Sequence, residues 1–451
     1  MEILTTHRKD SGRVIVFRTL CSIAVGILLV ANPARGQEPG PIEASPSVIG
    51  QRMAEEARPA TPLRELVEEV EESNPQLSGA YHAWMAATHV GGQAGSFPDT
   101  QIFVQHFGVG SPRPFAGYSN SDFAYIGVGA SQDIPFPGKR GLRRAVADRE
   151  ADSVHEQIDV VRRQVIEQLK LAYLQLAYIQ QTLGFLHESD QLLDQIQQAT
   201  ASQYRTGHGN QQDVLKAQLQ RTKNLMEITH HHQEEGQLEA QLKQILNRTQ
   251  TSPDITAETL TLNPLQNTDE ELLQHTGDDS PEVRTHSKML LQQGAQIELA
   301  YREFLPDFNI QYTYEHTASK FRDYYMATFG IKFPNRDRQF AALAQAYQNQ
   351  DRAKYELQAE EQRVLSEIKQ QTVFVRASEE RLKIYSEGLI PQSDATFQSG
   401  MAGYQSGRLD FAGLLSSFLD VLNANSEYRR ELMEHESALV RLERLTGVNL
   451  R

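Results

Sequence analysis

The chain has 451 residues, a net charge of −14 and a single cysteine, Cys21. Its length is sufficient for two or three domains, and its acidic balance argues against nucleic acid as a partner. Because Cys21 lies in an N-terminal segment that we expect to be removed, disulfide and thiol chemistry are excluded for the rest of the chain.

Residues 1–36 have the pattern of a secretory signal peptide. Basic residues precede an apolar run of 13 residues, Thr19–Ala31. This run is too short to span a bilayer but suits the apolar region of a signal peptide. Small residues then predict cleavage before Gln37, with residues 37–60 left as a leader. A retained membrane anchor is the alternative interpretation.

A helical sequence pattern begins near Thr61. It is followed by two segments, 100–109 and 122–134, that are rich in aromatic and β-branched residues and are bounded by Gly and Pro. These features predict β-strands. A long helix is predicted from Lys139 to about Gln203, because apolar residues recur every three or four positions without a proline. Such a helix would be ~95 Å long, and its sustained apolar spacing indicates packing against other helices.

The second half repeats this order after a linker. Residues 308–315 alternate strictly, with Ile310 on the apolar side and Gln311 on the polar side, and residues 325–333 predict a fourth strand. A second long helix is predicted at 338–389, where Pro391 interrupts or ends it.

Both halves end in the same sequence pattern, which consists of a helix, a Tyr-x-x-Gly turn and another helix. The two copies begin at Tyr204 and Tyr404, and their glycines are Gly207 and Gly407. The chain is therefore expected to be a two-fold internal repeat. The predicted boundaries are 61–250 for the first repeat, 251–279 for the linker and 280–451 for the second repeat.

Each predicted strand is about as long as a tilted strand that crosses a bilayer, roughly 9–11 residues. Four strands cannot close a barrel, and an open sheet edge cannot lie in lipid because its unpaired backbone groups each cost several kcal/mol. Several chains would have to combine their strands, and three chains would supply twelve. A half-buried soluble sheet is the alternative.

Several motifs together resemble the TolC-like outer-membrane efflux proteins, especially the heavy-metal efflux branch. The run Ser131–Arg140, SQDIPFPGKR, is similar to that family's strand-to-helix connection. NPQL at Asn74 and SPEV at Ser280 resemble the starts of its two repeats, and the duplicated Tyr-x-x-Gly hairpins resemble its periplasmic tips. The resemblance covers nearly all of residues 61–450.

The resemblance implies an α+β membrane protein that works as a homotrimer. Its 12-stranded β-barrel, with four strands per chain, would lie in the outer membrane and continue as a long α-helical barrel in the periplasm. A periplasmic adaptor protein would connect it to an inner-membrane efflux pump, and the duct would passively conduct what the pump delivers. No cofactor and no enzymatic activity are implied.

The same resemblance suggests candidate site residues at the tips. Gly207, His208, Gly407 and Arg408 would form the adaptor-docking surface, although a purely local turn requirement would also explain the glycines. Tyr404 corresponds to a tyrosine that tethers the second hairpin to the first.

Asp213 matches the acidic partner of that tyrosine, and Arg408 could pair with Asp213 as well. The alternative is that Asp213 only caps a helix. Relatives often carry an acidic ring after the second tip glycine, but this chain offers only Asp410 and Asp420 there, so these two are the alternative gate residues.

Two other functional classes are alternatives to a duct. A periplasmic coiled-coil scaffold without a pore would explain the helices, but the strict alternation of residues 308–315 favours a membrane duct. A secreted enzyme has no support from hydrolase, P-loop or metalloprotease motifs. Three adjacent histidines, His230–His232, cannot converge on one metal ion from one helix, because neighbouring residues point about 100° apart.

Overall fold

The computed structural model describes residues 60–110, 113–117, 121–274, 280–317, 323–448 and 450. The predicted signal peptide, and all of the leader except Ala60, lie outside these residues. Of the helices in the described residues, none is long and apolar enough to cross a membrane.

The first half begins with two short helices and continues through a strand pair into a very long helix. Its elements are α2 (Leu63–Ser73), α3 (Pro75–Ala94), β1 (Gln101–Phe107), β2 (Tyr125–Ile134), α4 (Lys139–Arg205) and α5 (Gln211–Ile245). Helix α4 has 67 residues and is therefore about 100 Å long. The predicted long helix is confirmed, and it extends two residues beyond Gln203.

The second half repeats this order. Its elements are α6 (Asp269–Gln274), α7 (Pro281–Arg302), β3 (Asp307–Thr317), β4 (Tyr324–Lys332), α8 (Arg336–Ile384), the π-turn η1 (Tyr385–Leu389), α9 (Ile390–Gln405) and α10 (Phe411–Thr446). Both α3 and α7 begin with a proline, directly after Asn74 and Ser280. Proline suits the first position of a helix, where no intrahelical N–H bond is lost.

Pro391 does interrupt the second long helix, but without ending it. The π-turn η1 precedes this proline and widens the backbone by one residue, so that α8 runs on into α9. The first half has no such interruption, since α4 passes the equivalent position as regular α-helix.

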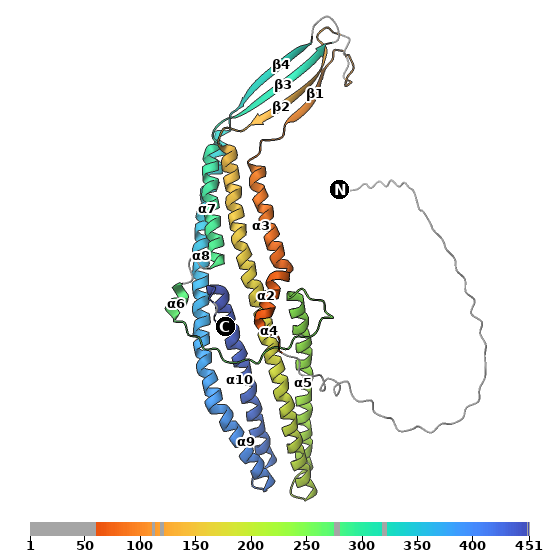
Figure 1. The fold of residues 1–451 in the computed structure, drawn as a ribbon, viewed down its shortest axis with the longest axis vertical. Coiled ribbons are helices and arrows are strands. Elements are labelled where there is room, and N and C mark those ends of the chain that lie inside the picture. Colours follow the sequence, from red (N-terminus) through yellow and green to blue (C-terminus); the bar gives the residue numbers. More distant parts are fainter. Residues whose placement is uncertain are drawn as a thin grey trace, which may run out of the picture. The chain divides into compact units, whose positions relative to one another are not determined.

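The four strands form one antiparallel sheet in the order β1-β2-β3-β4, which leaves β1 and β4 as open edges. The two predicted strand pairs are confirmed with shifted ends: β1 ends at Phe107 instead of Val109, and β2 begins at Tyr125 instead of Asp122. In Figure 1 the sheet joins the ends of α3, α4, α7 and α8, and the α4–α5 and α9–α10 hairpin turns lie at the opposite end of the helices.

Lys139 stabilises the junction between the sheet and the helices. Its ammonium group is 1% exposed, donates to Leu305 O at 2.8 Å and lies 3.1 Å from Glu303 and 2.9 Å from Asp307. Gly138 precedes it with φ +96°, a backbone conformation that favours glycine. The predicted strand-to-helix connection is thus a tight turn held by a buried lysine.

Residues 255–267 of the segment between the repeats lie across the helices. Ile255, Leu260 and Leu265 of this segment are buried. Side chains of the helices form hydrogen bonds with its backbone. Gln180 of α4 bonds to Ile255 O and Ala257 N, and Arg376 of α8 donates to Leu265 O and Asn267 O. The sequence indicated only a linker here, because these partners are distant along the chain.

Four larger apolar clusters form the core between the helices. Two join α4 with α2, α5 or α10, one joins α7, α8 and α10, and one lies near the hairpin turns. In Figure 1, α5 runs beside the distal part of α4, and α10 runs beside α8. The predicted side-by-side packing of long helices is confirmed.

Candidate functional site

The two hairpin turns have the same backbone geometry. Gly207 has φ +78° and Gly407 has φ +73°. In the first turn, Gly207 N donates to Tyr204 O and His208 N donates to Gln203 O, at 3.1 and 2.9 Å. The second turn repeats these bonds 200 residues later, with Arg408 in place of His208. This is the Schellman arrangement, in which a left-handed glycine ends a helix.

The side chains at both turns are open to solvent. Gly207, His208, Gly407 and Arg408 are exposed, and a Cβ added at either glycine would meet nothing within 4 Å. The glycines are therefore needed for their backbone conformation and not because the chain itself crowds them. The two turns also touch, since Gln203 Nε2 donates to Gln405 O at 3.2 Å.

Tyr404 lies inside the apolar cluster that joins the two hairpins. It is 6% exposed, and the cluster also holds Ile196 of α4, Ala217 of α5 and Phe418 of α10. Its hydroxyl lies beside that of Thr200 but makes no hydrogen bond of ordinary geometry among the described residues. Burial raises the pKa of Tyr404, the Thr200 hydroxyl lowers it, and the negative charge of Asp213 raises it. The phenol is thus a neutral donor near an acidic group.

Asp213 lies in the first turn of α5 and does not cap it, because Asn210 occupies the N-cap position. The alternative interpretation of Asp213 as a helix cap is therefore wrong. Among the described residues, no ion pair or hydrogen bond joins Asp213 to Tyr404 or to Arg408; the ion pairs on this part of α5 are those of Arg221. The structure brings the three tether residues to the same end of the molecule without direct bonds between them.

Asp410 is the residue that caps a helix. Its Oδ1 accepts from Gly413 N at 2.9 Å at the start of α10, which satisfies one of the free N–H groups there. Asp420 is exposed on the same helix. Of the two alternative gate residues, only Asp420 has a carboxylate without such a structural role.

Arg221 holds the first hairpin together and was not singled out from the sequence. It donates to both oxygens of Asp190 at 3.0 Å and to Asp194 at 2.6 Å, so it connects α5 to α4. The equivalent residue of the second hairpin is Val421. The four-residue spacing of Asp190 and Asp194 indicates only that both lie on one face of the helix. Their partner Arg221 is 27 to 31 residues away, so the pairing was not predictable.

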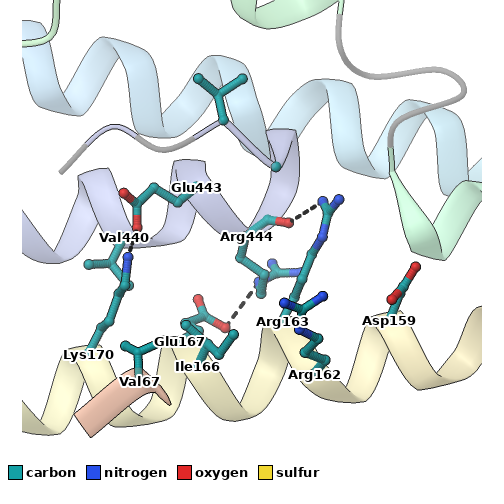
Figure 2. A pocket seen from close by; sticks show the side chains of 12 residues that line it. Val67, Asp159, Arg162, Arg163, Ile166, Glu167, Lys170, Val440, Glu443 and Arg444 are labelled. Carbon is teal, nitrogen blue, oxygen red and sulfur yellow. Dashed lines mark hydrogen bonds and ion pairs between the residues drawn. The ribbon is translucent and has the colours of Figure 1, made fainter. Parts of the chain in front are cut away.

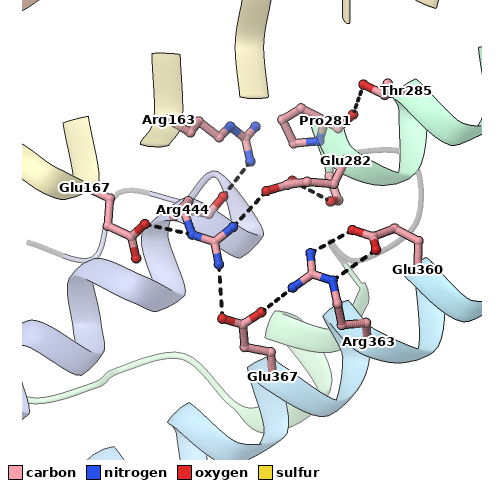
Figure 3. Close-up of polar contacts among 10 residues, drawn as sticks. Arg163, Glu167, Pro281, Glu282, Thr285, Glu360, Arg363, Glu367 and Arg444 are labelled. Carbon is pink, nitrogen blue, oxygen red and sulfur yellow. Dashed lines mark hydrogen bonds and ion pairs between the residues drawn. The ribbon is translucent and has the colours of Figure 1, made fainter. Parts of the chain in front are cut away.

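An arginine near the end of α10 joins three other helices (Figure 3). Arg444 is 11% exposed and lies 3.0 Å from Glu167 of α4, 2.7 Å from Glu282 of α7 and 3.0 Å from Glu367 of α8. Burial raises the pKa of Glu167, although Arg444 opposes this shift. The cluster ties the first repeat to the second.

A polar cavity of about 460 Å³ lies beside Arg444 (Figure 2). Lys170 is paired with Glu443 there, and Arg163 donates to Arg444 O at 3.1 Å. These cationic groups are already occupied by partners of the same chain. The cavity is therefore part of the inter-helix ion-pair cluster.

The adjacent histidines are paired with carboxylates of their own helix. His230 and His231 lie 3.3 and 2.8 Å from Glu234, and His232 lies 3.2 Å from Glu235. Within the described ranges, no group of three or more His, Cys, Asp or Glu residues could hold a metal ion.

The sheet exposes its apolar face, whereas the polar side chains in the middle of its other face are covered. Ile102 and Phe329 are 79% and 64% exposed, whereas Thr313 and Glu315 on the other face are 0% and 2% exposed. Glycines 127 and 129 permit this crowding, because a Cβ at Gly129 would lie 2.5 Å from the Phe103 ring. A sheet in a water-soluble domain normally has the reverse polarity.

Known proteins of this architecture are outer-membrane channels. The family described as "Outer membrane efflux protein" matches residues 66–248. The fold is similar to that of the outer-membrane channel OprN, with 17% identity, TM-score 0.74 and coverage of 86% of this chain and 90% of that one. No curated protein matches the chain at a significant level.

Two further solved structures share the fold. VceC from Vibrio cholerae is 17% identical, with TM-score 0.71 and coverage of 86% of this chain and 97% of that one. CusC is 16% identical, with TM-score 0.71 and coverage of 86% and 92%. The predicted resemblance to TolC-like outer-membrane efflux proteins is confirmed by the family match over residues 66–248 and by the shared fold.

Proposed function

We propose that this chain forms the exit duct of a tripartite efflux system, as a homotrimer with a 12-stranded barrel in the outer membrane and a helical tunnel in the periplasm. The inverted polarity of the sheet carries the proposal. An apolar outer face suits lipid, and a polar inner face suits a water-filled lumen. The family match and the fold of known efflux channels support the same function.

The open edges of the sheet explain why several copies are needed. An unpaired strand edge is not tolerated in lipid, since each free N–H and C=O group costs several kcal/mol. In this four-stranded antiparallel sheet β1 and β4 run in opposite directions, so β4 of one copy can pair with β1 of the next in antiparallel fashion. Three copies would close the barrel.

The assembly is tested by extracting the protein from membranes in mild detergent and measuring its mass. We expect a trimer that resists heating in detergent. A cysteine pair on the two edge strands, one in β1 and one in β4, should then produce disulfide-linked trimers. A monodisperse soluble monomer from the periplasm would contradict the duct and favour the scaffold alternative.

We further propose that the hairpin turns are the docking surface for a periplasmic adaptor that leads to an inner-membrane pump. Gly207 and Gly407 carry no side chain, and Gly207, His208, Gly407 and Arg408 are exposed at the turns. Gly407→Ala would place a Cβ on a backbone with φ +73°, which strains the turn by about 1 kcal/mol.

The docking test compares Gly407→Ala with Gly184→Ala, a change within the regular helix α4 at a position with open space. Adaptor crosslinking in cells should fall for Gly407→Ala and persist for Gly184→Ala, while both variants assemble as trimers. Unchanged crosslinking with Gly407→Ala would mean that the glycine serves only the local turn.

The gate is proposed to involve movement of the second hairpin against the first. The first hairpin is fixed by Arg221 with Asp190 and Asp194, whereas the second has Val421 at the arginine position and follows the π-turn η1. Tyr404, Asp213 and Arg408 are the proposed tether, and Asp420 is the alternative. π-turns inside helices commonly lie at functional sites, which supports the second hairpin as the moving part.

A further inference from the structure

Three aromatic rings lie next to one another on the polar face of the sheet, at the end farthest from the helices. Phe107 and Tyr125 stack with ring centroids 5.7 Å apart, and Tyr125 meets Tyr324 edge-on at 6.3 Å. They come from β1, β2 and β4. All three are on the face that would line the lumen, because Phe107 is paired with Tyr125 and Tyr324 with Glu315 in the strand register.

Glu315 of β3 lies among these rings. Its register partner is Tyr324, and its Oε1 accepts a 2.6 Å hydrogen bond from Gln105 Nε2. Gly127 lies beneath both side chains, since a Cβ there would be 3.0 Å from Gln105 and 3.1 Å from Glu315. The carboxylate is thus held in place by an amide and enclosed by its neighbours.

This carboxylate has no cationic partner in the described part of the chain. The ion pairs of the strands and their adjoining ends include Lys139–Asp307, Lys332–Asp133 and His316–Asp323, and none of them involves Glu315. Glu315 is nevertheless only 2% exposed, and a covered carboxylate is costly unless a positive charge compensates it. Two residues along the same face, the Thr313 hydroxyl is fully buried and has no hydrogen-bond partner among the described residues.

The aromatic rings are also without a cation. The cation–π contacts within the described residues involve Phe97, Phe136, Phe374 and Phe185, and none of the three rings. Phe107 and Tyr324 remain 48% and 42% exposed, so their faces are accessible from the polar side. Aromatic faces next to a carboxylate are the usual recognition elements for quaternary ammonium groups and other organic cations.

We propose that Phe107, Tyr125, Tyr324 and Glu315 form a binding site for organic cations on the lumen wall, near the exit of the duct. The inference rests on the proposed barrel, in which the polar face lines the lumen. The rings would contact the apolar and cationic surface of the ligand, and Glu315 would supply the countercharge. The trimer would carry three such sites, one on each chain.

The test uses the full-length trimer in planar bilayers at low salt, with benzyltrimethylammonium as the probe. The probe should reduce single-channel current in a concentration-dependent manner, whereas neutral benzyl alcohol at the same concentrations should not. Glu315→Gln and Tyr324→Leu should each raise the half-blocking concentration about five- to tenfold. Tyr324→Phe keeps the ring and removes only the hydroxyl that meets Glu315, so it should raise the half-blocking concentration less than Tyr324→Leu does.

Gln311→Ala is the matched control, because it changes the same strand and the same face nearer the helices. It should leave the block unchanged, and every variant is first shown to be a trimer of normal mass. Channels that the probe does not block, or that it blocks equally in Glu315→Gln, would overturn the cation site while leaving the duct intact. A protein that forms no channels would overturn the duct and the site together.

Discussion

At the residue scale, the most informative side chain of the tips is Tyr404. Within the described residues its buried hydroxyl makes no hydrogen bond of ordinary geometry, and a buried unsatisfied hydroxyl costs about 1–3 kcal/mol. Its raised pKa keeps the phenol protonated, so it can donate to a carboxylate that approaches it. The nearest charge that acts on it is that of Asp213. The Tyr404 hydroxyl could therefore donate to Asp213 in one state of the gate and not in the other.

We expect Asp213→Ala combined with Tyr404→Phe to raise single-channel conductance without lowering the amount of trimer. A single hydrogen bond of this kind contributes only ~1 kcal/mol, so three copies could hold a closed state and still yield to adaptor binding. Asp420→Ala is the comparison variant. Wild-type conductance in the double variant, with higher conductance in Asp420→Ala, would move the gate to Asp420.

The sheet gives a second prediction at this scale. Ile310 is 46% exposed on the apolar face, and Gln311 is its neighbour on the polar face. Ile310→Asp should lower trimer yield and heat resistance by placing a charge in lipid, at a cost of about 2 kcal/mol per chain. Gln311→Asp should be tolerated. Equal yields of the two variants would refute the proposed orientation of the strands.

At the element scale, the two hairpins differ although their turns are the same. Helix α5 is joined to α4 by the Arg221 ion pairs, and its far end is joined to the inter-repeat segment by Lys243, which lies 2.7 Å from Asp254. The second hairpin instead packs by the apolar cluster around Tyr404 and follows η1. The α4–α5 hairpin is fixed by ion pairs, whereas the α9–α10 hairpin is held by apolar contacts. We therefore expect the second hairpin to move more easily than the first.

The attachment of α5 to the inter-repeat segment should depend on pH. Burial, and then the hydrogen bond and charge of Asp254, raise the pKa of Glu239 to about 7. Because this folded-state pKa lies above the ordinary value of 4.5, the contribution of Glu239 to stability is complete below about pH 4.5 and is lost as pH rises through 7.

Glu239→Gln should therefore stabilise the protein near pH 8, by about 1 kcal/mol after allowing for solvent screening, and should have little effect near pH 5. Thermal unfolding of the trimer at the two pH values measures this difference. Glu227→Gln changes an exposed carboxylate of the same helix and should show no such pH dependence. A Glu239→Gln variant with the wild-type pH profile would contradict the shifted pKa.

At the scale of the whole molecule, the Arg444 cluster and the inter-repeat segment unite the two repeats. Arg444 of α10 meets carboxylates from α4, α7 and α8, and Arg363 shares Glu367 with it (Figure 3). Four helices from both halves thus converge on one guanidinium.

Arg444→Leu should be strongly destabilising, because it leaves Glu167, Glu282 and Glu367 without their shared cation. Removing one member of a buried ion cluster costs about 3–5 kcal/mol. Urea unfolding followed by circular dichroism measures the loss. Arg64→Leu breaks an exposed pair with Glu68 and should change stability by about 1 kcal/mol or less. Similar losses for both variants would show that the cluster does not join the halves.

Much of the architecture could be predicted from the sequence because its signals are local. Alternation along residues 308–315 predicted β3, and the three- and four-residue spacing predicted α4 to within two residues of its end. The duplicated glycines predicted two turns in which glycine permits a positive φ, and both Gly207 and Gly407 have a positive φ. Period and turn chemistry act over a few residues, so one sequence is sufficient to detect them.

The roles of single side chains at the candidate site were less predictable. Asp213 and Asp410 are both acidic residues at the start of a helix, yet only the Asp410 carboxylate accepts a hydrogen bond from a backbone N–H group of the helix N-terminus. The difference depends on which residue adopts the extended N-cap conformation. That choice follows from turn length and packing, which the residue types alone do not specify.

The sequence by itself determined the elements, their twofold repetition and the two faces of each strand, because each is encoded by neighbours in the chain. Only the tertiary structure decided that residues 255–267 lie across α4 and α8. The same holds for the contact of Arg444 with three carboxylates. It also holds for the position of Glu315 among Phe107, Tyr125 and Tyr324. These groupings join residues far apart along the chain. They depend on strand register and helix packing, and these are set by the burial of the whole assembly of elements.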